Sequence, residues 1–315
     1  MSDASRFRST RRALVVLNTR SRHGQEGIEA AAAILRGADI ELVEADCEPD
    51  HLRDRIASQR HDLSCVLAAG GDGTVNAVGR AMMETRLPLG VLPLGTANDF
   101  ARSVGIPPDL AAAARIIAEG HLRTIDVGEA NGHAFFNVAS VGLAVDLAKS
   151  LTTERKRRFG RFSYALTAAW LLAQTRPFHA TLSGREDAGD LADVLVRTLQ
   201  VSVGNGRYYG GGNVVAPDAR IDDGLLHLYS LEFPQIWRMA LMVPSFPHGR
   251  NGSMREVRTA QGHSFKVVTR KPRPVNADGE LVTETPVVFT QKKRALDVFV
   301  PSERATLAGA ERRQL

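Results

Sequence analysis

The first 125 residues alternate short apolar runs with longer amphipathic segments, and this alternation constrains the fold more than any other feature. The apolar runs are Ala13–Leu17, Ile40–Val43, Leu63–Ala69 and Leu89–Pro93. The helical patterns between and after them are Gln25–Leu35, Asp50–Ala57, Thr74–Met83 and Asp109–Glu119. Short strands separated by helices of about ten residues are typical of βα units. We therefore expect an α/β domain, with a parallel sheet between two helical layers.

After Thr124 the pattern changes to that of an antiparallel protein. Asn131-Gly132 lies between the β-like runs Ile125–Ala130 and His133–Val141 and indicates a hairpin. A helical stretch from Leu143 to Thr175 precedes a series of further β-like runs. These are Phe178–Leu182, Val194–Val203, Leu225–Leu231, Phe265–Thr269, Val287–Thr290 and Ala295–Val300. The pattern predicts an antiparallel β-sandwich. We expect an α/β domain over 1–126, the sandwich over 127–300 and a tail over 301–315.

Composition limits the class of protein. A length of 315 residues suggests about two domains. Two cysteines, Cys47 and Cys65, exclude a disulfide scaffold and a four-cysteine zinc site, and they favour a reduced, cytosolic setting. No apolar run reaches the roughly 18 residues of a membrane span, and no signal-peptide core follows the N-terminus, so we expect a soluble, intracellular protein. A net charge of +5 does not by itself indicate nucleic-acid binding.

A glycine-rich turn follows the third apolar run and carries the first chemical signal. It reads Gly70-Gly71-Asp72-Gly73-Thr74-Val75-Asn76. Three glycines in four residues let the backbone pass close to a bulky group, and the start of the next helix suits phosphate. A carboxylate such as Asp72 beside phosphates calls for a metal ion or a proton-transfer role. The alternative is a plain strand–helix turn that Asp72 caps.

A second turn of this kind follows the fourth apolar run, over Pro93–Ala101. In a parallel sheet both turns fall at the carboxyl ends of strands, where ligands bind. Thr96 and Asn98 bring a hydroxyl and an amide to that edge. Taken alone, Asn98 or Asp99 is most simply a helix N-cap.

Together with three later segments, these turns are similar to the diacylglycerol kinase catalytic-domain superfamily, and specifically to its soluble bacterial lipid kinases. The matching segments are Gly70–Asn76, Pro93–Ala101, Ile125–Gly128, Asn205–Gly212 leading to Ala216–Gly224, and Asp278–Glu280. They occur in the family's order and spacing, and the resemblance covers about Ala13 to Val300. The first motif is shared with NAD kinases and phosphofructokinases, whereas the whole set is much more specific.

The resemblance implies roles for particular residues. The ATP contacts would be Gly70, Gly71, Asp72, Gly73, Thr74, Val75, Asn76 and Thr96. Glu280 would accept the proton of the lipid hydroxyl, and Asp72 would be the partner of the catalytic magnesium, in keeping with the needs of phosphoryl transfer. The alternative for Glu280 is a solvated residue of a hairpin turn.

The resemblance also implies a second, structural magnesium. The backbone carbonyls of Arg220 and Leu225 and the carboxylate of Asp223 would hold it, although a turn without metal is the alternative. Asp126 would belong to a buried inter-domain polar network, or else cap a strand end.

Three positions depart from the family pattern. The first loop lacks its proline, which leaves Arg20 and Arg22 as candidates for its usual lysine. Glu44 or Ala45 stands where a threonine is common, and Ala77 replaces a glutamate.

Two segments suit a membrane substrate. Arg155–Phe162 combines five basic residues with two aromatic ones, which fits an anionic surface, and Tyr164–Ala173 is apolar. Phe233–Phe246 is rich in Met and aromatic residues. Ordinary helix or sandwich core is the alternative for each. The histidines show no spacing typical of a zinc site.

The sequence therefore predicts an ATP- and Mg²⁺-dependent lipid kinase that phosphorylates a hydroxyl of a diacylglycerol-like membrane lipid. Diacylglycerol, phosphatidylglycerol, ceramide and sphingoid bases all stay open as acceptors. We expect a cytoplasmic protein that contacts the membrane peripherally and does not bind nucleic acid, and a homodimer is compatible with the sequence. The alternatives are a soluble-metabolite kinase related to NAD kinase and a non-catalytic lipid- or nucleotide-binding protein.

Overall fold

The computed structural model describes residues 11–17, 25–45, 51–143, 176–186, 189–209, 213–214, 219–232 and 257–302. The chain forms two compact units. The first contains Met1–Asp126 and Lys293–Leu315, and the second contains Val127–Lys292. The chain thus passes from one unit to the other twice.

The first unit is built on a parallel sheet. Its strands, in spatial order, are β2 (Ile40–Ala45), β1 (Arg11–Leu17), β3 (Cys65–Gly70), β4 (Leu89–Pro93) and the C-terminal part of β18 (Val287–Phe299). Every neighbouring pair in this series is parallel. Parallel neighbours need crossover connections, which the helices between the strands provide.

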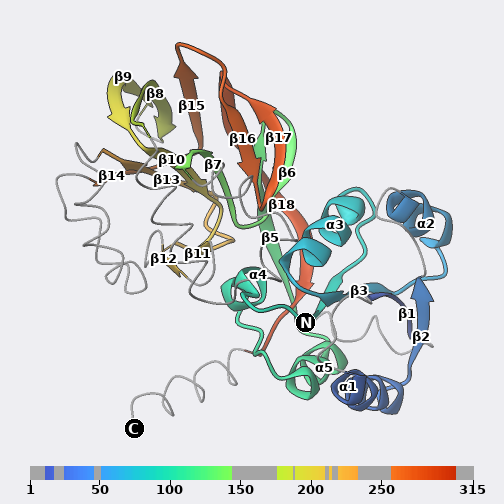
Figure 1. Cartoon of the computed structure of the whole chain (residues 1–315). Helices are drawn as coiled ribbons and strands as arrows, with labels where there is room; N and C mark the ends of the chain where they lie inside the picture. The colour runs from blue at the N-terminus through green and yellow to red at the C-terminus, as the bar shows by residue number, and fades with distance from the viewer. Residues whose placement is uncertain are drawn as a thin grey trace, which may run out of the picture. The chain divides into compact units, whose positions relative to one another are not determined.

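The helices of the first unit cover both faces of this sheet. Figure 1 shows α1 (Gln25–Gly37) and α5 (Leu110–Glu119) on one face and α2 (Leu52–Gln59) and α3 (Asp72–Met82) on the other. A short helix, α4 (Asp99–Ser103), follows β4. The predicted three-layer α/β domain is confirmed.

Close packing of this unit is clearest at its two central strands. Every residue of β3 and β4 is buried, as expected for strands covered on both faces. At Gly90 of β4, an added Cβ would lie 2.4 Å from a Leu67 methyl and 3.0 Å from Ile117 of α5. Glycine at this position lets α5 pack directly against the strand.

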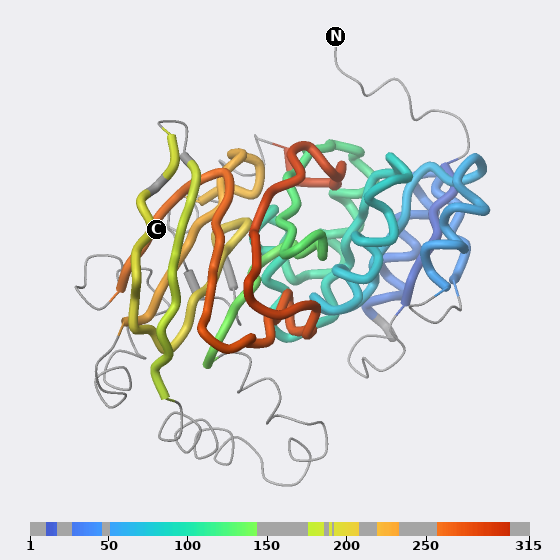
Figure 2. Tube along the Cα trace, turned by 90° about the horizontal axis from the view of Figure 1, so that it is seen from above, coloured from blue at the N-terminus to red at the C-terminus, as the bar shows by residue number. Residues whose placement is uncertain are grey.

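The second unit contains two antiparallel sheets. One has the order β18, β15 (Ser264–Thr269), β8 (Phe178–Glu186) and β9 (Gly189–Thr198), and it also includes β5 (Leu122–Ala130) and β6 (His133–Phe135). The other has the order β14 (Val257–Gly262), β13 (Leu226–Leu231), β10 (Gln200–Gly204), β7 (Val138–Gly142), β16 (Pro274–Ala277) and β17 (Glu280–Glu284). A small separate pair is formed by β11 (Tyr208–Tyr209) and β12 (Asn213–Val214). Figure 2 shows the β8–β9 hairpin, in yellow tones, beside β15 in orange.

A shared apolar core joins these two sheets. Val201 and Val203 of β10 and Phe135 and Phe289 of the other sheet are all buried in one cluster. The rings of Phe135 and Phe289 meet edge to face with centroids 6.5 Å apart, a favoured aromatic geometry. The predicted antiparallel β-sandwich, and with it the fold class, is confirmed.

Three strand predictions were wrong in detail. The run His133–Val141 divides into β6 and β7, and Val194–Val203 divides into β9 and β10, each pair lying in different sheets. Apolar residues occur on both sides of such corners, so a count of apolar residues does not reveal them. Conversely, Val287–Thr290 and Ala295–Val300 belong to the single strand β18, whose intervening residues Lys292–Arg294 are exposed.

Two further expectations concern helices. The predicted helical stretch beyond Leu143 lies outside the described residues. Among the described helices, none has the length and apolar character to cross a bilayer.

Burial makes the thiol of Cys65 a probe of the first unit. Its side chain is 3% exposed, and burial raises the pKa to about 12 despite the nearby charge of Arg11. Because the thiolate is the reactive form, Cys65 should resist a maleimide or disulfide reagent at pH 8 in the native protein and react fully in denaturant. Mass spectrometry of peptides that contain Cys65 measures this. Rapid native labelling would contradict the packing described for β3.

Candidate functional site

Two turns lie side by side at the carboxyl ends of β3 and β4. The strands are paired in parallel up to Gly70 and Pro93. Beyond that pair, the N–H of Leu94 donates to the carbonyl of Gly70 at 2.9 Å. The predicted convergence of the two turns at one sheet edge is therefore observed.

The turns touch through glycine backbone. A Cβ on Gly71 would lie 3.2 Å from the Cα of Gly95, and a Cβ on Gly95 would lie 2.6 Å from the Cα of Gly71. The Gly95 Cβ would also lie 2.7 Å from Oδ1 of Asn98. The fold itself thus calls for glycine at Gly95, and a Cβ on Gly71 would need the Gly95 backbone to move by a few tenths of an ångström.

Gly73 is different. It is exposed at the start of α3, a Cβ there would meet nothing within 4 Å, and its backbone is not left-handed. Nothing in the fold around Gly73 calls for glycine, whereas a ligand that approaches the backbone closely would. Thr96 is also exposed, on the second turn.

Asp72 and Asn98 hold the turns in shape. Oδ1 of Asp72 accepts the N–H of Phe100 at 3.0 Å, so the carboxylate caps α4 and not its own helix, whose N-cap is Gly71. The idea that Asp72 caps the helix after its own turn is therefore wrong. Asn98, with φ of 50°, accepts the N–H of Gly95 at 3.0 Å and donates to its carbonyl at 2.8 Å. Asn98 is the N-cap residue of α4, but its side chain closes the turn.

Asn76 presents a buried amide without a partner. Its side chain is 2% exposed, and neither Oδ1 nor Nδ2 makes a hydrogen bond among the described residues. Leaving a buried amide unpaired costs about 1–3 kcal/mol. Such a group, in the first turns of the helix that begins at Asp72, is suited to a polar ligand that the chain does not itself supply.

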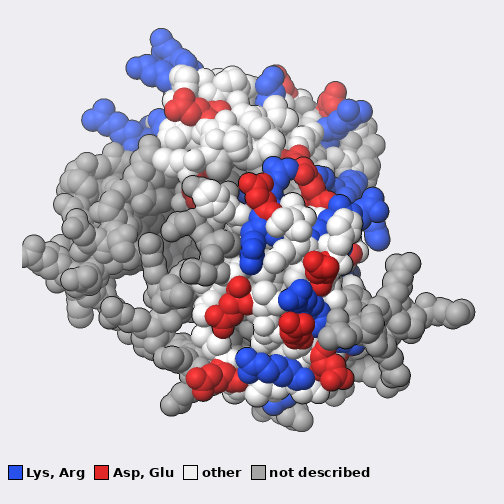
Figure 3. Space-filling view, turned by 90° about the vertical axis from the view of Figure 1, so that its right-hand side faces the viewer, with Lys and Arg blue, Asp and Glu red and all other residues white. Residues whose placement is uncertain are grey.

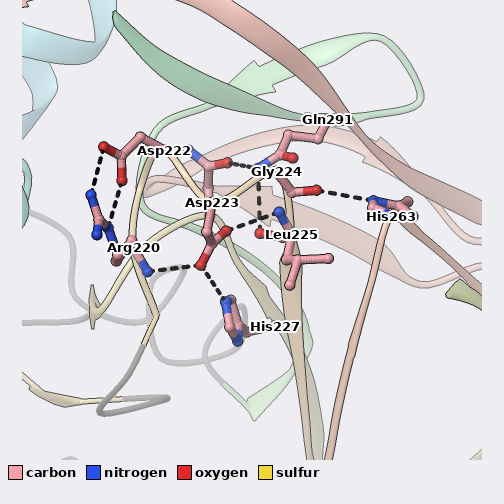
Figure 4. A network of polar contacts seen from close by, with 9 residues as sticks. Arg220, Asp222, Asp223, Gly224, Leu225, His227, His263 and Gln291 are labelled. Carbon is pink, nitrogen blue, oxygen red and sulfur yellow. Dashed lines mark hydrogen bonds and ion pairs between the residues drawn. The ribbon is translucent and has the colours of Figure 1, made fainter. Parts of the chain in front are cut away.

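Arg220, Asp223 and Leu225 come together in the second unit, in the network of Figure 4. Oδ2 of Asp223 accepts the N–H of Arg220, and Oδ1 accepts the N–H of Leu225, each at 2.9 Å. Nε2 of His227 lies 3.5 Å from Oδ2 of Asp223. The carbonyl of Leu225 accepts from Nε2 of Gln291 at 3.3 Å.

These hydrogen bonds determine the charge state of Asp223. Burial raises the pKa of this carboxyl, but the nearby His227 imidazole and the hydrogen bonds from the N–H groups of Arg220 and Leu225 outweigh burial and hold the pKa below its ordinary value. Protein donors already engage both carboxylate oxygens and the Leu225 carbonyl. Hydrogen bonding alone therefore explains this turn, and magnesium would add to bonds that are already made.

Glu280 begins β17, directly after a two-residue turn. Asp278 and Gly279 form that turn with φ of 51° and 99°, and Ala277 pairs with Glu280 across it. Glu280 is exposed. It belongs to the second unit, whereas the glycine turns belong to the first.

Asp126 is buried in the first unit, where its Oδ1 accepts the N–H of Arg294 at 2.7 Å. The carboxylate therefore ties β5 to β18.

Several predicted positions do not enter these clusters. Glu44 and Ala45 end β2, and Ala77 lies within α3. Arg20, Arg22, and the segments 155–162, 164–173 and 233–246 lie outside the described residues. On the face drawn in Figure 3, acidic and basic side chains of the described residues are interspersed.

A pocket of about 450 Å³ lies elsewhere in the first unit, lined by Met82, Arg86, Leu87, Thr124, Arg294, Ala295, Leu296 and Asp297. Leu87 precedes β4, whereas Gly95 follows it. The pocket thus lies at the opposite end of the strands from the glycine turns.

The carboxylate of Asp278 has a tertiary role that the sequence does not predict. It accepts N–H groups from Phe136, Asn137 and Val138. Asp278-Gly279 was recognisable as a turn, but no local signal connects it to residues some 140 positions earlier.

Comparison with known proteins covers most of the chain. Residues 12–130 match the family described as the diacylglycerol kinase catalytic domain, and residues 137–300 match the YegS C-terminal NAD kinase beta sandwich-like domain. A "Probable lipid kinase YegS-like" of Pseudomonas aeruginosa is 35% identical over 89% of this chain and 91% of its own length. A diacylglycerol kinase of Bacillus subtilis is 33% identical over 81% of this chain and 83% of its own.

The fold has a counterpart among solved structures. A diacylglycerol kinase structure from Bacillus anthracis superposes with a TM-score of 0.73, covering 93% of this chain and 97% of that one at 23% identity. At this identity the likeness concerns the fold alone.

The two kinds of glycine should respond differently to a methyl group. Gly95→Ala should lower the free energy of unfolding by about 1–3 kcal/mol, because its Cβ meets backbone and the Asn98 amide. Gly73→Ala should stay within about 1 kcal/mol of the unchanged protein, since alanine favours a helix and meets nothing there. Urea unfolding measures both. Equal losses would refute the steric distinction.

The charge on Asp223 should stabilise the fold in a pH-dependent way. A carboxyl whose pKa is lowered in the folded state contributes stability above its unfolded pKa of about 4 and loses it as pH falls through the folded value. Asp223→Ala should therefore cost about 1–3 kcal/mol at pH 7, and less with falling pH below about 4. Urea unfolding across this range is the measurement.

Asp190→Asn is the matched control for Asp223. It removes only the exposed pair with Arg185 and should cost at most about 0.5 kcal/mol. A loss for Asp223→Ala that did not change with pH would show that the charge of Asp223 is unimportant.

Proposed function

The chain belongs to the family of diacylglycerol kinases and YegS-like lipid kinases, and from that premise we propose that it transfers the γ-phosphoryl group of ATP to a hydroxyl of a diacylglycerol-like lipid. The roles fall on the two glycine turns of the first unit and on Glu280 of the second.

The observation that carries the proposal is the combination of Gly73 and Asn76. Gly73 has open space where a side chain would be, and Asn76 keeps a buried amide without a partner among the described residues. A phosphate close to the backbone would account for both, since it fills the space and accepts a hydrogen bond from Nδ2. The remaining residues of the turn, and Thr96, are proposed as further ATP contacts.

Asp72 is the proposed partner of a catalytic Mg²⁺. Its hydrogen bond to Phe100 uses Oδ1 and fixes the carboxylate beside the glycine turn, which leaves Oδ2 suited to the hard oxygen ligation that Mg²⁺ prefers. Such a cation offsets the negative charge of the phosphates. Asp72 thus serves both the fold and the proposed site.

Glu280 is the proposed general base. The lipid hydroxyl oxygen attacks the γ-phosphorus, the bond from that phosphorus to the β–γ bridging oxygen breaks, and ADP departs. The hydroxyl proton passes to the Glu280 carboxylate, whose exposed position at the start of β17 is compatible with access to a substrate.

The names of the relatives support the choice of lipid class. The Bacillus subtilis relative is named a diacylglycerol kinase, and we assign a diacylglycerol-like acceptor to this chain on that basis. Four further points remain predictions: peripheral membrane contact, a cytoplasmic location, a homodimer, and a second magnesium at Arg220, Asp223 and Leu225.

One alternative has an observation of its own. The matched C-terminal family is described by its likeness to the NAD kinase sandwich, and the first glycine motif is shared with such kinases. A soluble acceptor is therefore the second candidate, and the partition of labelled product between organic and aqueous phases distinguishes the two.

We expect γ-labelled ATP, Mg²⁺ and mixed diacylglycerol–phospholipid vesicles to give a labelled lipid. Glu280→Gln should lower kcat at least about 100-fold, because the proton acceptor is lost while the shape is kept. Asp72→Asn keeps the Oδ1 acceptor for Phe100 but loses the charge, and should raise the Mg²⁺ requirement at least about tenfold. Chromatography of the organic phase identifies the product.

Gly73→Ala separates binding from folding. It should weaken ATP binding at least about tenfold by calorimetry while the free energy of unfolding stays nearly unchanged, because the methyl group enters space assigned to phosphate. Unaltered ATP affinity would refute that assignment. Label confined to the aqueous phase would favour the soluble acceptor, and ATP binding without transfer to any acceptor would favour a non-catalytic protein.

A further inference from the structure

The carboxylate of Asp278 is held by three consecutive backbone N–H groups. Oδ2 accepts from Phe136 at 2.6 Å, and Oδ1 accepts from Asn137 and Val138 at 3.0 Å each. The N–H of Asp278 in turn donates to the carbonyl of Val138 at 2.9 Å. Four hydrogen bonds thus fasten the turn before Glu280 to the segment between β6 and β7.

Turn formation alone does not call for this arrangement. Asn131-Gly132 makes a turn of the same kind, with φ of 49° and 84°, and an asparagine is sufficient there. At 278 three donors converge on two oxygens. An asparagine offers a single acceptor oxygen and would turn its NH₂ group toward a backbone N–H. Aspartate is required at 278 because the three N–H groups of residues 136–138 need two acceptor oxygens.

The segment that receives Asp278 is itself fixed. Asn205 is fully buried, its Nδ2 donates to the carbonyl of Phe136 at 3.3 Å, and its N–H donates to the carbonyl of Asn137 at 2.9 Å. Nε2 of Gln291 donates to Oδ1 of Asn205 at 3.0 Å. Asp278 therefore attaches the turn to a rigid part of the sandwich core.

Glu280 follows this anchored turn directly. It is exposed and stands two residues from Asp278, across a glycine with φ of 99°. Among the described strands, β17 is at the edge of its sheet and pairs with β16. The N–H of Gly279 donates to Oδ1 of Asn276 at 2.8 Å, which closes the turn locally, whereas the Asp278 carboxylate ties the turn to residues 136–138. The backbone position from which the Glu280 side chain leaves therefore depends on Asp278.

We propose that Asp278 is a positioning residue for Glu280: its carboxylate, bound by the N–H groups of Phe136, Asn137 and Val138, sets where the general base stands. This rests on the proposed function of Glu280. A misplacement of a reacting group by about 1 Å is enough to cost on the order of 100-fold in rate.

The experiment compares Asp278→Asn, Glu280→Gln and the double variant in the vesicle assay. Asp278→Asn should lower kcat about 10- to 100-fold, with KM for ATP within twofold because the proposed ATP contacts lie in the first unit. The double variant should be no slower than Glu280→Gln alone, since a positioning effect vanishes once the base is absent. Asp109→Asn is the matched control, a carboxylate that accepts one backbone N–H, from Ala112, and it should leave kcat unchanged.

Hydrogen exchange gives a readout that does not need activity. The amides of Phe136, Asn137 and Val138 should exchange at least about tenfold faster in Asp278→Asn than in the unchanged protein. If Asp278→Asn fails to fold, Asp278→Ser takes its place, because the serine side chain is smaller. The same decrease in kcat and the same faster amide exchange are expected.

The outcomes separate the two proposals. If Glu280→Gln lowers kcat but Asp278→Asn does not, the positioning role is wrong and the proposed base stands. If the two effects multiply in the double variant, Asp278 acts independently of Glu280 and the inference is overturned. If Glu280→Gln leaves kcat unchanged, the proposed base fails, and the positioning role fails with it.

Discussion

The contact between Gly71 and Gly95 is the constraint on which the proposed nucleotide site depends. Two strand–helix turns approach so closely that a Cβ on Gly95 would lie 2.6 Å from the Cα of Gly71. That proximity lets the Asp72 carboxylate accept the N–H of Phe100. The first residue of α3 is thereby tied to the start of α4. The same approach gives Gly73 and Thr96 one solvent-exposed edge. A steric property of two residues thus determines where the polar groups of both turns stand.

Much of the fold is legible in the sequence because its signals are local. The alternation of apolar runs and helices before Thr124 has a period that only βα units satisfy, and β1 to β4 follow it closely. Sheet corners are not local. Val194–Val203 has apolar residues on both sides of Leu199, yet it changes sheets there, because both β9 and β10 bury apolar residues in the same core. At β18 the exposed basic residues interrupt the apolar pattern, and Arg294 has a φ of 51°, yet the strand continues to Phe299.

The same difference between local and tertiary features applies to the candidate sites. The glycine turn and the Asp-Gly-Glu turn were found because each is a short motif. Their tertiary roles were not, because the partners lie far away in the chain: Asp72 caps a helix 28 residues on, and Asp278 binds N–H groups some 140 residues earlier. The local sequence therefore indicates which chemistry a residue can perform. The segment that its side chain binds becomes known only from the folded structure.

The two passages of the chain between the units bear on how the protein is made. The first unit is not a continuous segment, since Val298 of β18 pairs with Leu89 of β4 in its sheet. A ribosome releases β18 last among the strands. Domains of many proteins fold as their N-terminal part emerges. Here the α/β unit lacks an edge strand until nearly the whole chain has been synthesised, so a nascent chain carries an open sheet edge for most of its translation.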